Sequence, residues 1–205
     1  MDRLDDLLAT AGPLLRRVDA MLAGGGAPPG DEVWTQLRRV RLLPGDAARA
    51  VAALRPADLE DAAPELRADA RAYAVLAGSL PGPGEWSGTA ADAYDRARAR
   101  TATHLSGGHR SLDERLQASA DLADALIEWM RHTRESLAAV LGDVLSSMEA
   151  VILSGTRVDV STPRELAAAA VVGERVLRAV ADAYDGGTDL LRSSAELTEP
   201  VPAMR

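Results

Sequence analysis

The segment from residue 112 to residue 153 constrains the fold most, because apolar side chains recur along it in steps of three and four. Nine of the twelve positions on this line are apolar, a period near the 3.5 residues of a coiled coil. We expect one unbroken helix, about 65 Å long, which needs a partner along most of its length. Leu126, Met130, Leu137 and Val144 are the predicted helix-interface residues. The line consists of Leu112, Leu116, Ser119, Ala123, Leu126, Met130, Thr133, Leu137, Val140, Val144, Ser147 and Val151.

The rest of the chain also favours helix. Aromatic residues make up 3% of the sequence, and alternation of β-branched residues is confined to Val158–Val160. Alanine, leucine, arginine and glutamate dominate, and all four have high helix propensity. We therefore expect an all-α protein, an elongated helical bundle built on a long antiparallel helical hairpin.

Glycine and proline mark the predicted ends of several helices. The run 24–30 is a loop, Pro44 and Gly45 end a short helix, and Gly186 with Gly187 ends or frays the last one. Between these breaks we expect helices at 2–22, 32–43, 47–54, 56–80 and 163–191, and a helix that resumes after the Trp86 corner and continues toward Leu105. The apolar phase continues past the glycines at 107 and 108, which predicts one long bent helix there or two nearly collinear ones.

We divide the chain into three parts. Residues 1–55 form short accessory helices, 56–195 hold the hairpin and a C-terminal packing helix, and 196–205 are expected to be a loose tail. The packing helix has the clearest start. Thr162 is its predicted N-cap, Pro163 occupies the first turn and Glu165 completes a capping box.

Charge and hydropathy exclude several classes of function. The formal net charge is −8, and a nucleic-acid binder gathers a basic face, so we expect no nucleic acid as a partner. No run approaches the roughly 18 apolar residues that span a bilayer, so we expect no integral membrane segment. The acidic start also differs from a signal peptide.

The residue types that are missing are informative too. The chain has no cysteine, which removes disulfides, thiolate metal sites and thiol catalysis. Lysine, asparagine and phenylalanine are also absent, and AT-rich codons encode all three. This bias indicates a GC-rich genome, such as that of an actinobacterium.

Few residues suggest chemistry. His104 and His109 are five positions apart, which does not align them on one helical face, and His132 has no ligand pattern around it. The glycines at 24–26 follow no strand and lack the Lys-Ser/Thr of a phosphate loop. No Gly-x-Ser-x-Gly elbow occurs. We expect no catalytic residue, no metal and no cofactor, and a protein that is not an enzyme.

The corner around Trp86 is the most informative local motif. A breaker, Pro81-Gly82-Pro83-Gly84, separates two helical stretches, and Trp86-Ser87-Gly88 opens the second. Ala90 and Ala91 allow close helix approach, and Tyr94 follows Trp86 by eight positions. On its own, a Trp that covers the end of a helical hairpin, with a glycine in the turn, has a purely structural explanation.

In this context the corner resembles the WXG (Trp-x-Gly) family of type VII, or ESX-like, secretion substrates, as an enlarged actinobacterial-type member. The resemblance covers about residues 56–154. It implies a helical hairpin that is exported folded, as a dimer, by a membrane ATPase. The implied partners are a protein, either a second copy or another WXG-like chain, and the secretion ATPase. Trp86, Gly88 and Tyr94 would form the export motif at the turn.

The chain departs from the family pattern in three ways. It is about twice the usual length, Gly107 and Gly108 interrupt the second helix, and the C-terminal Tyr-x-x-x-Asp/Glu signal is degenerate. After Tyr184 the matching position is Thr188, and the acid comes one residue later at Asp189.

We expect a non-enzymatic substrate or export partner of a type VII system that acts through helix–helix interaction. It would be cytoplasmic before export and then secreted or in the cell envelope. The alternative is a cytoplasmic helical scaffold, or a chaperone-like or immunity-like partner, of a co-encoded secreted protein.

Overall fold

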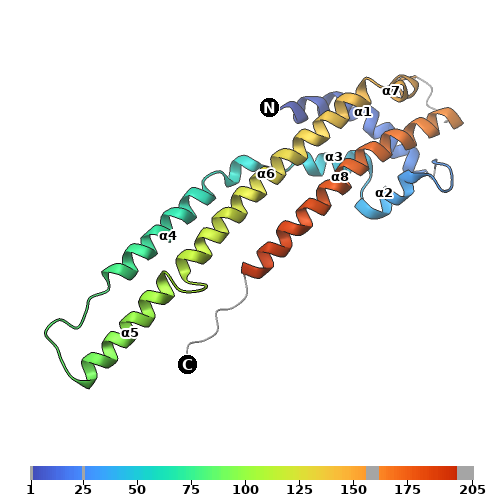
Figure 1. Cartoon of the computed structure of the whole chain (residues 1–205). Helices are drawn as coiled ribbons and strands as arrows, with labels where there is room; N and C mark the ends of the chain where they lie inside the picture. The colour runs from blue at the N-terminus through green and yellow to red at the C-terminus, as the bar shows by residue number, and fades with distance from the viewer. Residues whose placement is uncertain (1, 25, 156–161, 198–205) are drawn as a thin grey trace. The chain divides into compact units, whose positions relative to one another are not determined.

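The computed structural model describes residues 2–24, 26–155 and 162–197, and within these ranges the chain is helical and contains no strand (Figure 1). This confirms the all-α class. The elongated bundle on one long hairpin stays a prediction. The elements are α1 (Arg3–Ala23), α2 (Glu32–Val40), α3 (Pro44–Ala52), a 3₁₀ turn η1 (Pro56–Leu59), α4 (Ala62–Ser79), α5 (Thr89–Leu105), α6 (Leu112–Leu145), α7 (Met148–Leu153) and α8 (Pro163–Leu197).

The chain forms two compact units. Unit 1 comprises Met1–Arg55 and Glu128–Thr188, and unit 2 comprises Pro56–Ile127 and Asp189–Arg205. Both long helices, α6 and α8, contribute to each unit. This grouping differs from the three-part division by sequence, because the first 55 residues share a unit with the second half of α6 and most of α8. Of the tail expected at 196–205, residues 198–205 lie outside the described part, as do Val158–Val160.

Unit 1 contains the main hydrophobic core. Buried side chains follow one face of α1 at helical spacing, and they pack with residues of α3, α6 and α8. Pro13 lies inside α1 without dividing it, and the carboxylate of Asp2 caps the first turn. The largest fully buried members are Leu4, Leu15, Val18, Val33, Pro44, Leu137, Leu141, Val144, Val172, Val176, Leu177 and Val180.

Arg134 links three segments of unit 1. Its side chain is only 8% exposed, and it donates hydrogen bonds to the carboxylates of Asp2, at 2.6 and 2.9 Å, and Asp5, at 3.3 Å. It also donates to carbonyl oxygens at and beyond the end of α3, at 2.6 Å to Ala52 and 3.0 Å to Leu54. A buried guanidinium needs this many acceptors, because an unpaired charge in the interior is costly.

Unit 2 is packed far more sparsely. Helices α4 and α5 contact each other, and Arg67 of α4 donates to Asp121 and Asp124 of α6 at 2.8 and 2.7 Å. Most of the side chains it buries are too small to contribute much apolar surface. Among its described residues, those buried are Ala63, Ala70, Ala91, Ser111, Ala120 and Ile127.

The prediction of one unbroken helix over 112–153 was wrong. Helix α6 ends at Leu145 and the short α7 begins at Met148. At the break, the hydroxyls of Ser146 and Ser147 donate to backbone carbonyls of α6, and Ser147 then caps α7 by accepting from Ala150 N–H at 3.3 Å. Serine side chains compete in this way with the helical hydrogen bonds.

Two predicted helix ends were also misplaced. The helix expected at 32–43 ends at Val40, where Arg41 takes a left-handed conformation with φ of 60°. Pro44 and Gly45 begin α3 instead of ending the helix before it, as suits a proline in a first turn. These two residues therefore belong to the helix that follows them.

The last helix begins as predicted. The hydroxyl of Thr162 accepts from Glu165 N–H at 3.2 Å, and the Glu165 carboxylate accepts from Thr162 N–H at 2.7 Å. This helix runs on to Leu197, through Gly186 and Gly187, so those glycines neither end nor interrupt it.

Candidate functional site

The corner between α4 and α5 is built by its glycines and prolines. Helix α4 ends at Ser79, and the chain then turns until Gly88 serves as the N-cap of α5. Gly88 has φ of 98° and ψ of −177°, a region that only glycine occupies readily. A Cβ here would meet no atom within 4 Å, so backbone conformation, rather than space, requires glycine at this position.

The corner presents an aromatic pair to solvent. The ring centroids of Trp86 and Tyr94 are 5.9 Å apart, with their planes inclined at 48°, a favourable tilted contact. The Tyr94 hydroxyl donates to the carbonyl of Pro81 at 2.8 Å, which ties α5 back to the breaker. Trp86 remains 54% exposed and Tyr94 37%. The structure thus brings the predicted motif residues together and leaves the Trp ring accessible.

Helix α4 has an exposed apolar face of its own. At about 100° per residue, Ala68, Ala72, Val75 and Leu76 share the face opposite buried Ala70. All four side chains are exposed, and the largest two are Val75, 71% exposed, and Leu76, 47% exposed. We call these four residues the α4 stripe. Exposed large aliphatic residues grouped on one helix face are typical of a surface that another protein covers.

The predicted interface residues on α6 divide into two kinds. Leu137 and Val144 are fully buried in the core of unit 1. Leu126 in unit 2 and Met130 in unit 1 are half-buried. The two buried residues therefore pack within this chain.

The degenerate C-terminal signal lies within helix α8. Tyr184 is exposed, and Asp189 accepts from Arg192 at 2.6 Å in an ion pair along the same helix. Asp189 follows Tyr184 by five positions, which places the two about 140° apart around the helix. The two side chains do not share a face.

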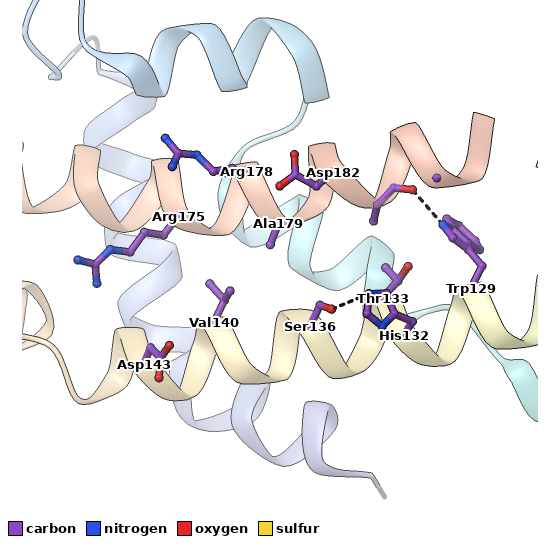
Figure 2. Close-up of a pocket in the computed structure, with 12 residues that line it drawn as sticks. Trp129, His132, Thr133, Ser136, Val140, Asp143, Arg175, Arg178, Ala179 and Asp182 are labelled. Atoms are coloured by element: carbon purple, nitrogen blue, oxygen red, sulfur yellow. Dashed lines mark hydrogen bonds between the residues drawn. The ribbon is translucent and has the colours of Figure 1, made fainter. Parts of the chain in front are cut away.

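A groove between α6 and α8 in unit 1 was not predicted (Figure 2). Its volume is about 740 Å³. Trp129 lies at one end, where its indole N–H donates to the carbonyl of Ala183 at 2.9 Å. A Cβ at Gly187 would lie 3.1 Å from the Trp129 ring, so the glycines inside α8 make room for this side chain. The lining residues are Trp129, His132, Thr133, Ser136, Val140, Asp143, Arg175, Arg178, Ala179, Asp182, Ala183 and Gly186.

Thr133 is the unusual residue of this groove. It is 4% exposed, and its hydroxyl has no hydrogen-bond partner among the described residues. A buried hydroxyl without a partner costs free energy. The sequence placed Thr133 on the apolar line of α6 and gave no sign that its hydroxyl would be left unpaired.

The ionisable groups with shifted pKa values have structural causes. At the α5–α6 junction, hydroxyls of Ser106 and Ser111 donate to Asp113 and lower the pKa of its carboxyl. Burial raises the pKa of Asp19, although the N–H of Gly45 opposes this by donating at 2.9 Å. In the described ranges, no three His, Asp or Glu side chains converge as metal ligands.

Within the described residues, no helix combines the length and apolarity needed to cross a bilayer. Comparisons with protein-family models, with curated proteins and with solved structures found no match to this chain.

Proposed function

We propose that this chain is a non-enzymatic helical protein of a type VII secretion system, either a substrate or an export partner, of the WXG kind and from an actinobacterial-type source. The exposed Trp86–Tyr94 pair at the α4–α5 corner is the observation that carries this proposal. A turn that needed tryptophan only for packing would cover its ring, but more than half of the Trp86 side chain is open to solvent.

The proposed mechanism is recognition between helices. The α4 stripe and the aromatic corner would bind a protein partner, either a second copy or another WXG-like chain, through burial of apolar surface. Tryptophan and tyrosine at such a surface contribute strongly to affinity. The secretion ATPase would then read the corner, and the protein would pass from the cytoplasm to the cell envelope or the medium.

Cell fractionation tests the proposal. A tagged full-length chain is followed in filtrate, envelope and lysate of its source organism, with and without the secretion ATPase. We expect it in the filtrate only when the ATPase is present. Trp86→Ala should abolish that export, while Trp86→Phe should retain part of it. Leu191→Ala, which truncates another exposed residue of unit 2, is the control and should be exported normally. Unchanged export of Trp86→Ala would overturn the assigned role of the corner.

One observation favours the alternative, a cytoplasmic scaffold or a chaperone-like or immunity-like partner. Asp189 is paired with Arg192 and lies on a different face from Tyr184, so these residues do not form a joint signal. On that alternative, the tagged chain stays in the lysate of both strains. Proteins that co-purify with it would then include the secreted partner.

A further inference from the structure

We infer that the groove between α6 and α8 binds helix α4 of a second copy of this chain. The contact would join the groove in unit 1 of one copy to α4 in unit 2 of another, and it does not depend on secretion. The length and lining of the groove and the charges on both surfaces support it.

The groove matches one helix in its length and in the residues that line it. Each wall is a line of residues at steps of three and four, and the positions from Trp129 to Asp143 span about 21 Å along α6. On the α8 side the floor residues Ala179, Ala183 and Gly186 are small, which allows a helix backbone to approach closely. The 18 residues of α4 extend about 27 Å, enough to fill this length.

The charges on the two surfaces are complementary. Figure 2 shows Arg175 and Asp143 at the same end of the groove, on opposite walls. Around α4, Asp69 flanks one side of the α4 stripe and Arg71 flanks the other, at about 100° per residue. With the stripe facing the groove, and the start of α4 at the Arg175 end, Asp69 lies beside Arg175 and Arg71 beside Asp143. Glu65 projects between Ala72 and Leu76, on the Asp69 side of the stripe, and adds to the acidic side.

The apolar contacts agree with this register. Val75 faces the α6 wall, where Val140 lies, and Leu76 faces the small residues Ala179 and Ala183 of α8. After Arg71, α4 carries no charged residue, so no charge of α4 lies beside Asp182 in this register. Asp182 already forms an ion pair with Arg39, at 3.6 Å. An interface of one helix face is small, so we expect self-association in the micromolar range.

Two charge-swapped variants test the inference at constant net charge. Asp143→Arg with Arg175→Glu reverses the groove, and Asp69→Arg with Arg71→Glu reverses α4. Sedimentation equilibrium of the full chain should show an average mass that rises with concentration for the wild type. Each swapped variant should associate at least about tenfold more weakly, because like charges then meet. An equimolar mixture of the two should recover association, because a reversed helix then finds a reversed groove.

Further variants separate the contact from general effects. Leu76→Ser should weaken association and Leu191→Ser should not, although both remove an exposed leucine of unit 2. Circular dichroism verifies that every variant stays folded. A wild type that remains monomeric throughout the micromolar range would overturn the inference. So would swapped variants that associate normally, or a mixture that fails to restore association.

Discussion

The two units use similar helix-forming sequences but bury very different amounts of apolar surface. Every member of the main cluster of buried residues lies in unit 1, including the large side chains Leu15, Leu141 and Leu177. Unit 2 buries mostly alanines and leaves Val75, Leu76 and Trp86 exposed. Since burial of large apolar side chains dominates folding free energy, unit 1 has an extensive hydrophobic core, whereas unit 2 leaves much of its large apolar surface exposed.

The largest expected contrast comes from the same truncation in each unit. Leu141→Ala removes a fully buried side chain of unit 1 and should lower the free energy of unfolding by about 2–5 kcal/mol. Leu76→Ala in unit 2 should change it by less than about 0.5 kcal/mol, because that residue is already exposed. Urea unfolding measures both. Equal losses would contradict the contrast.

A second contrast concerns the two arginine clusters. Arg134→Met removes a buried cation and leaves Asp2 and several carbonyl groups without their donor, which should destabilise unit 1 by about 2–4 kcal/mol. Arg67→Met, which breaks exposed ion pairs to Asp121 and Asp124, should cost much less. Thermal unfolding by circular dichroism tests the ranking, which a larger loss in Arg67→Met would reverse.

The third prediction concerns the corner glycine. Gly88→Ala should destabilise the α4–α5 corner by about 1–3 kcal/mol, because φ of 98° is strained for any residue with a Cβ. Gly82→Ala in the same loop is the matched control, since a Cβ there also meets open space. Urea unfolding of Trp86-only variants, with Trp34 and Trp129 replaced by phenylalanine, reports on this region. Identical midpoints for the two alanine variants would refute the strain.

The fourth prediction is a small gain in unit 2. Gly78 lies inside α4, and a Cβ added there would meet no atom within 4 Å, so Gly78→Ala should stabilise this helix by about 0.5–1 kcal/mol. The same replacement at Gly187 should gain less, because the new Cβ would crowd Trp129 in unit 1. Thermal unfolding of both variants measures the difference. A larger gain at Gly187 would show that Trp129 moves aside at little cost.

The smallest expected effect is on how the stability of unit 2 depends on pH. Hydrogen bonds from Arg67 and then Gln117 hold the pKa of Asp121 below its ordinary value. A carboxyl with a lowered pKa stabilises the folded state above its unfolded pKa, about 3.9, and loses that contribution as pH falls through the folded pKa. In Arg67→Met, the stability of unit 2 should therefore fall less steeply as the pH is lowered below about 4. Trp86 fluorescence in acid titrations monitors this, and an unchanged acid profile would exclude the ion pairs as its cause.

The sequence predicted helices well where the signals are local. The capping box of Thr162 and Glu165 lies within four residues, and the corner at Trp86 is marked by adjacent prolines and glycines. Both were located correctly. Such signals act through nearest neighbours along the chain, so no tertiary structure is needed to interpret them.

The errors came from interactions between distant segments or from residues with two possible roles. Gly186 and Gly187 remain helical beneath Trp129, which comes from another helix. Ser146 and Ser147 break α6 with hydroxyl hydrogen bonds that many serines make without breaking a helix. The α6–α8 groove was out of reach for the same reason as the glycines, because its walls lie far apart in the sequence.

Native-state hydrogen exchange of the full chain tests the central contrast most directly. Amides in α4 and α5 should exchange through low-energy local openings, while those of α1 and of α8 up to residue 188 should exchange only on global unfolding. Equal protection of α1, α4, α5 and α8 in the isolated chain would contradict the claim that unit 2 is an incompletely packed surface.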